Sequence, residues 1–141
     1  MRRHVPAMLI AALLPLLAGC VQDTASYMIG GDRNHAITVA RAQTWFWSSG
    51  VDVSVIAARQ PDCLGGLDVK GVARETELIL HQAPDDYPEP IYILDIGGTD
   101  YAVSTVSCRV QKFAQRPADP GPVIGRFKEE EGKLRFVAAA K

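Results

Sequence analysis

The 141-residue chain lacks most of the patterns on which enzymes and nucleic-acid-binding proteins depend. It contains only 3 histidines, and no Gly-x-Ser-x-Gly, His-Glu-x-x-His or phosphate-binding loop occurs in it. Its formal net charge is −1 and its basic residues are scattered, so the basic patch of a nucleic-acid-binding protein is missing. These absences predict no catalytic residues, no resident metal or cofactor, and no nucleic-acid partner.

A sustained helical period is also missing from the sequence. Apolar residues instead alternate with polar ones, as where Val51, Val53 and Val55 enclose Asp52 and Ser54. About eight short strands, separated by turn residues, predict a single all-β domain, either an antiparallel β-sandwich or a small barrel. We expect this β domain to cover residues 35–141.

Turn residues place several of the strand boundaries. One strand is predicted over residues 35–47, where the turn Ser48-Ser49-Gly50 follows. The pair Gly97-Gly98 predicts a tight hairpin, because glycine readily adopts the positive φ that such a turn requires. Residues 101–113 are then the predicted return strand, which carries Cys108.

The densest aromatic cluster is formed by Trp45, Phe46 and Trp47. In a strand, Trp45 and Trp47 share one face and Phe46 lies on the other. Either the domain covers both faces or a ring is left exposed, and exposed aromatic side chains are enriched in binding hot spots. The cluster is therefore a candidate partner-binding surface.

The N-terminus carries a targeting pattern. Arg2 and Arg3 precede an uncharged apolar stretch of about 14 residues, shorter than the roughly 20 that a membrane-spanning helix needs. The stretch ends in Leu17-Ala18-Gly19-Cys20. These residues resemble the signal peptide and lipobox of bacterial lipoproteins, and all four lipobox positions match. The resemblance implies a signal peptide over residues 1–19, cleavage before Cys20, and lipid attachment to the Cys20 thiol, with palmitate among the acyl chains.

The resemblance also implies a location. In enteric bacteria, lipoproteins with Asp directly after the lipidated Cys stay in the inner membrane. Val21 occupies that position here, which implies the outer membrane, with the domain facing the periplasm. Residues 21–34 are mostly polar and include Gly30-Gly31, so we expect residues 20–34 to comprise the lipidated Cys and a tether.

Cys63 and Cys108 remain once Cys20 is assigned to lipid. In an oxidising compartment they form an even pair, and a disulfide between them would close a loop across about 45 residues. Two free thiols, or a thiol-based catalytic or metal site with His81, are the alternatives. The Asp62-Cys63 pair after the Trp-Phe-Trp segment, together with a second Cys near the end of a late strand, resembles the pattern of a group of small proteobacterial lipoproteins. This resemblance implies no particular activity.

Two classes of function stay open for the folded domain. The first is a non-catalytic binding or structural module, anchored to an envelope membrane by lipid and contacting an envelope protein. The alternative is an envelope enzyme or small-ligand carrier with a site between the sheets. An exposed aromatic patch would favour the first class, and a deep polar pocket around His81 would favour the second.

Overall fold

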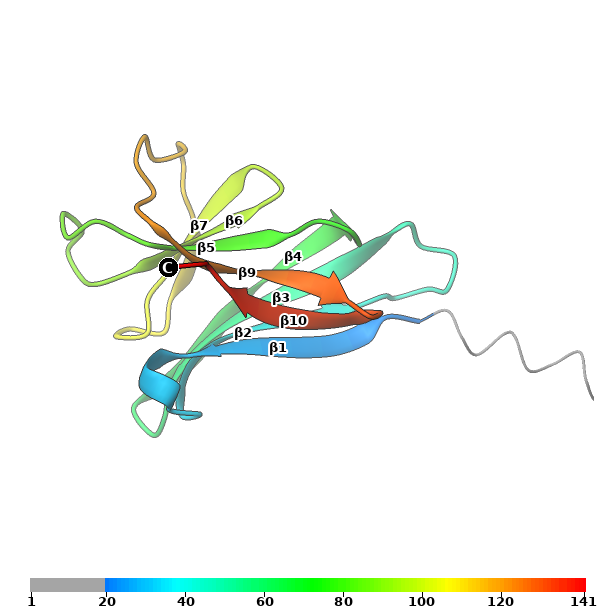
Figure 1. Cartoon of the computed structure of the whole chain (residues 1–141), viewed down its shortest axis with the longest axis horizontal. Coiled ribbons are helices and arrows are strands. Elements are labelled where there is room, and N and C mark those ends of the chain that lie inside the picture. The colour runs from blue at the N-terminus through cyan, green and yellow to red at the C-terminus, as the bar shows by residue number, and fades with distance from the viewer. Residues whose placement is uncertain (1–19) are drawn as a thin grey trace, which may run out of the picture.

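The computed structural model describes residues 20–141, which form two antiparallel sheets packed face to face (Figure 1). The prediction of a single all-β domain is confirmed. Of the two expected architectures the sandwich is present, since the strands form separate sheets of four and six and do not close into one barrel. The expected signal segment, residues 1–19, lies outside the described residues.

The four-stranded sheet is a meander in which each strand pairs with the next along the chain. A short 3-10 turn over Ile29–Gly31 connects its first two strands. Its members are β1 (Gln22–Met28), β2 (His35–Ala42), β3 (Gly50–Arg59) and β4 (Cys63–Ala73).

The six-stranded sheet has the order β10-β9-β5-β6-β7-β8, because the chain returns after β8 to place β9 beside β5. The tight hairpin predicted at Gly97-Gly98 connects β6 to β7, and both glycines have positive φ. Its members are β5 (Leu78–Gln82), β6 (Tyr92–Ile96), β7 (Thr99–Val103), β8 (Val110–Lys112), β9 (Val123–Glu130) and β10 (Lys133–Ala138).

The core fills the space between the two sheets. From β3, alternate residues Val51, Val53 and Val55 point inward and are at most 2% exposed. They belong to one apolar cluster with Leu80 and Phe127 of the other sheet, both fully buried. Burial of a side chain of this size contributes roughly 1.5–3 kcal/mol, so the alternation that predicted the strands also accounts for the packing of the sheets.

Strand β1 differs from the sequence analysis. Residues 22–28 were expected to belong to a tether, but they pair along their whole length with β2, from Gln22↔Ala42 to Met28↔Ala36. The inward side chains of β1 are Asp23, Ala25 and Tyr27, a set too polar to look like a core-facing strand. The ordered domain therefore begins beside Cys20 rather than at residue 35.

Two further strand predictions were wrong in their bounds. Strand β2 ends at Ala42, so residues 43–49 form a loop in place of the predicted strand end. The return strand predicted over residues 101–113 is divided into β7 and β8, because the Ser104 hydroxyl accepts the N–H groups of Val106 and Ser107 and turns the chain. The described residues thus hold ten strands where about eight were expected.

Candidate functional site

The predicted disulfide is confirmed and joins the two sheets. Cys63 is the first residue of β4, while Cys108 lies in the loop between β7 and β8 with a φ of 55°. Their Cα atoms are 5.8 Å apart, within the range that a disulfide requires. The bond consumes both thiols, so neither can supply the thiolate that a thiol hydrolase or a soft metal site needs.

His81 is half-buried and hydrogen-bonds to the backbone of a neighbouring segment. Its Nδ1 lies 2.9 Å from the carbonyl oxygen of Gly121, so the ring bridges β5 to the segment that precedes β9. Within residues 20–141, no group of three or more His, Cys, Asp or Glu side chains is placed to hold a metal ion. The arrangement therefore gives no support to the alternatives that used His81.

The aromatic cluster lies at the tip of the loop over residues 43–49, hereafter the aromatic loop. Trp45, Phe46 and Trp47 are 57%, 62% and 65% exposed, so of the two alternatives the domain leaves the rings exposed. The Trp45 and Trp47 rings stack with centroids 5.1 Å apart. Phe46 packs edge-on against Trp47 at 4.7 Å. The three rings form one apolar projection that the rest of the described domain leaves uncovered.

Near the same end, Arg41 is buried between the sheets and holds a cluster of charges. Its guanidinium donates to both carboxylate oxygens of Asp23, at 2.9 and 2.7 Å, and to Glu129 at 3.1 Å. Arg74 donates to the same Glu129 carboxylate at 2.9 Å. We call these four residues the Arg41 cluster. Sequence reasoning missed it because its members come from four separate segments of the chain.

The electrostatics of the Arg41 cluster follow from these hydrogen bonds. Donation from Arg41 lowers the pKa of Asp23, although burial of the carboxylate acts in the opposite direction. Donation from Arg74, and then from Arg41, likewise lowers the pKa of Glu129. Both carboxylates are thus held in their charged form, which makes the cluster a structural ion-pair network and not an acid–base pair.

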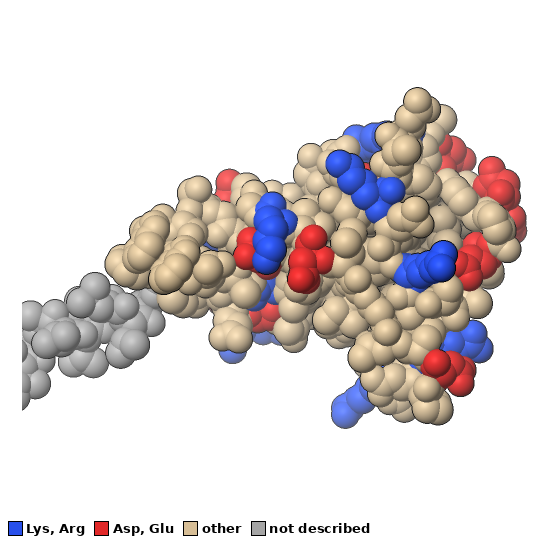
Figure 2. Space-filling view, turned by 180° about the vertical axis from the view of Figure 1, so that it is seen from behind, with Lys and Arg blue, Asp and Glu red and all other residues tan. Residues whose placement is uncertain are grey.

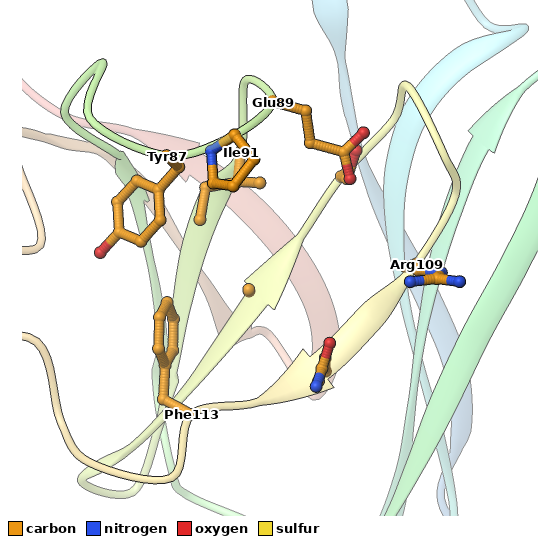
Figure 3. A pocket seen from close by; sticks show the side chains of 9 residues that line it. Tyr87, Glu89, Ile91, Arg109 and Phe113 are labelled. Carbon is orange, nitrogen blue, oxygen red and sulfur yellow. The ribbon is translucent and has the colours of Figure 1, made fainter.

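A groove of about 420 Å³ opens on the outer face of the six-stranded sheet (Figure 3). Tyr87 and Phe113 form one wall, with ring centroids 6.1 Å apart, and Ile91 adds apolar surface beside Tyr87. Glu89 and Arg109 lie toward the opposite side of the groove. The groove thus combines aromatic and apolar surface with one acidic and one basic side chain.

The two charged side chains of the groove, Glu89 and Arg109, differ in their partners. Glu89 accepts a hydrogen bond from the Ser107 hydroxyl at 2.7 Å. Arg109 is exposed and makes no salt bridge with any of the described residues. Burial, with a smaller contribution from Asp86, raises the pKa of Tyr87, so its hydroxyl stays protonated. The groove therefore offers an open guanidinium opposite an aromatic wall.

The groove and Cys20 lie at opposite ends of the sandwich. Strand β2 begins at His35, whose Nε2 lies 2.8 Å from the Thr105 hydroxyl in the loop beside the groove. It ends at Ala42, which pairs with Gln22, two residues after Cys20. At about 3.3 Å per residue, these two ends of β2 are about 23 Å apart.

The sequence analysis did not anticipate the groove. The two rings of its aromatic wall come from irregular segments, one before β6 and one after β8, and neither segment carries a local motif. No family model matches the chain, and neither does any curated protein or solved structure. Among the described residues there is no helix of the length and apolarity that a membrane crossing requires.

Proposed function

We propose that this chain is a lipid-anchored protein of the bacterial cell envelope whose β-sandwich binds another envelope component without catalysis. Support for the anchor comes from the lipobox residues Leu17-Ala18-Gly19-Cys20 and from the exposure of Cys20 directly before the ordered domain. Support for an outer-membrane location facing the periplasm comes from Val21, which replaces the retention signal at that position.

The observation that carries the binding proposal is the groove at the end opposite Cys20. A domain held by lipid at one end presents its other end to the periplasm, so the groove faces away from the membrane. Its volume of about 420 Å³ falls within the range of binding pockets. The aromatic wall and Arg109 together suit a partner segment that offers an apolar side chain beside an acidic group.

The alternative of a carrier or enzyme with a site between the sheets has less support. Fully buried side chains, among them Leu80, Val53 and Phe127, occupy that space. A ligand there would have to displace close-packed core, and each large side chain lost from a core costs about 2–5 kcal/mol. The outer-face groove requires no such rearrangement.

Site-specific photo-crosslinking in the native envelope tests the binding proposal. A photoreactive residue at Gln111, on the groove, should yield a defined crosslinked partner, whereas one at Asp68, exposed on the other sheet, should not. Changing Arg109→Glu should abolish the Gln111 product, and Arg109→Lys should retain part of it. Equal products at both positions, or a Gln111 product that Arg109→Glu leaves unchanged, would contradict the proposal.

The anchor has a separate test. Metabolic labelling with a palmitate analogue should mark the wild-type protein, and Cys20→Ser should lose the label and release soluble protein or leave the precursor uncleaved. The wild-type protein should fractionate with outer-membrane markers. Label on the Cys20→Ser protein would show that lipid is attached elsewhere, and fractionation with inner-membrane markers would overturn the proposed location.

A further inference from the structure

We infer that the aromatic loop inserts into the interface of the membrane that holds Cys20, so that the sandwich stands with this end on the lipid surface. The inference rests on the proposed lipid attachment at Cys20, and it adds to that attachment a second contact that fixes how the domain is oriented.

The hydrogen-bond register brings the aromatic loop to Cys20. Strands β1 and β2 are antiparallel with Gln22 opposite Ala42, so the loop that leaves β2 emerges beside the chain that enters β1. The Gln43 N–H donates to the Val21 carbonyl at 2.8 Å, and the Val21 N–H donates to the Gln43 side chain at 3.3 Å. Val21, the neighbour of Cys20, is therefore bound directly to the aromatic loop. Figure 1 shows this loop in cyan at the end where β1 begins.

Internal hydrogen bonds hold the aromatic loop in shape. The Gln43 side-chain amide donates to the Ser48 carbonyl at 2.7 Å, and the Ser48 N–H donates to the Trp45 carbonyl at 3.0 Å. The Thr44 hydroxyl donates to Asp52 of β3 at 3.1 Å. These hydrogen bonds pair backbone groups of the loop with other groups of the domain. Insertion of the rings into a membrane would therefore not require these backbone groups to lose their partners.

The composition of the aromatic loop suits lipid headgroups. Residues 43–49 contain no charged side chain, and Trp is the residue type most enriched, with Tyr, where a membrane meets water. Seen from behind, the end of the molecule near Cys20 is an uncharged projection, with the Lys, Arg, Asp and Glu side chains set back from its tip (Figure 2). Insertion would therefore take apolar surface out of water without burying a charge.

Distance favours lipid over a protein as the occupant. Only Val21 separates Cys20 from β1, and two extended residues span at most about 7 Å. A lipid chain on Cys20 would thus bring the aromatic loop close to the headgroups, which leaves little room for a protein to cover it. Glu130 at the end of β9, Glu131 in the turn and Lys133 at the start of β10 lie at the same end. The charges there are therefore of both signs, and attraction to anionic lipid is not the cause.

Tryptophan fluorescence, excited selectively over the 4 tyrosines, reports on this loop alone, since the 2 tryptophans of the chain are Trp45 and Trp47. The full-chain lipoprotein, as cells process it, is reconstituted into vesicles of phosphatidylethanolamine and phosphatidylglycerol. A second set of vesicles carries bromine on the same acyl chains. We expect emission at shorter wavelength than in detergent-free buffer, protection from iodide, and loss of most emission in the brominated vesicles. Raising the salt concentration should change none of these signals, because no ion pair is involved.

Two variants at equally exposed positions test whether bromine quenching depends on the aromatic loop. Phe46→Ser removes a ring that is 62% exposed and leaves both reporters in place, so bromine quenching should fall. Leu64→Ser removes a side chain that is 63% exposed at the far end of β3–β4, where it pairs with Ala58, so quenching should be unchanged. Circular dichroism would establish that both variants keep the wild-type fold.

The outcomes separate the inference from the proposed function. If the protein sediments with vesicles but its emission stays open to iodide and insensitive to bromine, the insertion is overturned and the lipid anchor stands. A second outcome would also overturn the insertion: emission that is protected from iodide in native membranes but is not quenched in the brominated vesicles. This outcome would point to a protein that covers the aromatic loop. If the wild-type protein fails to sediment with vesicles, the proposed anchor fails and the inference fails with it.

Discussion

The two edges at which the sheets of the sandwich meet are closed in different ways. At the edge where β1 lies beside β10, the Arg41 cluster bridges the sheets, and the Leu134 N–H of β10 donates to Asp23 of β1. At the other edge, the Cys63–Cys108 disulfide joins β4 to the loop before β8. One edge therefore depends on ion pairs and the other on a covalent bond.

The local packing explains this difference. Next to the Arg41 cluster, Tyr27 of β1 packs against Phe136 of β10 with ring centroids 5.0 Å apart, so the charges add to an apolar contact. Strand β8 has only three residues and contributes little ladder. A loop attached to so short a strand has few contacts of its own, and a disulfide restrains it without requiring more apolar surface. The edge with the longer strands β1 and β10 is therefore closed by side-chain contacts, and the edge with the short strand β8 by a covalent bond.

The largest loss of stability should follow Arg41→Ala. Removing this buried guanidinium leaves Asp23 without its ion-pair partner and typically costs about 3–5 kcal/mol. Urea denaturation would measure the change in free energy of unfolding. Arg74→Ala is the matched control, since Arg74 binds the same Glu129 from a half-exposed position and such pairs contribute about 1 kcal/mol or less. Equal losses in the two variants would show that burial of Arg41 does not matter.

Removal of the disulfide should have the next largest effect. Changing Cys63 and Cys108 together to Ala should lower the free energy of unfolding by about 2–5 kcal/mol while leaving the groove able to bind its partner. Mass spectrometry of the wild-type domain should show that the non-reduced form is lighter than the reduced form by two hydrogen atoms. Loss of binding with the fold intact would instead assign a direct role to one of the thiols.

A smaller effect is expected from Gly65→Ala on β4. A Cβ at this position would meet the backbone carbonyl oxygen of Cys108, so the loop before β8 must shift. Overpacking of this kind costs about 1–3 kcal/mol. In the variant that lacks both cysteines the loop is free to move, so the cost should shrink; additive costs in a double-mutant cycle would show that the disulfide does not press the loop against Gly65.

Much of the sandwich was predictable because its strands follow a strict alternation. Val51, Val53 and Val55 identify β3, and the Gly97-Gly98 turn identifies the β6–β7 hairpin, since both signals are local. The pairing of Cys63 with Cys108 was the favoured prediction once the lipobox resemblance assigned Cys20 to lipid. The strand and hairpin inferences need only neighbouring residues, and the disulfide inference needs that resemblance as well.

The remaining features depend on contacts that no local pattern carries. Strand β1 faces the core with Asp23, which makes sense only when Arg41 is known to lie opposite. The turn Ser48-Ser49-Gly50 predicts that the strand continues to residue 47, whereas the aromatic rings before this turn are exposed and pack on none of the strands. The groove needs Tyr87 and Phe113, which come from two irregular segments on either side of β6, β7 and β8 in the sequence. No local pattern in the intervening residues indicates that the two rings meet.

The smallest effect should come from mild acid, and it should distinguish the two edges. The folded-state pKa values of Asp23 and Glu129 are lowered, so their contribution to stability is complete above their unfolded values of about 3.9 and 4.3 and is lost as pH falls through the folded values. The disulfide does not titrate. Stability measured by urea denaturation should therefore decline as the pH falls from about 5 toward 3.

The variant Asp23→Asn/Glu129→Gln makes this prediction specific to the Arg41 cluster. It should be less stable than wild type at neutral pH but should lose less stability between neutral pH and acid, because the two groups that take up protons are gone. The variant without the disulfide should lose as much on acidification as the wild-type protein. If all three proteins decline in parallel, the acid sensitivity arises from carboxylates outside the Arg41 cluster, and the two edges do not differ in their response to pH.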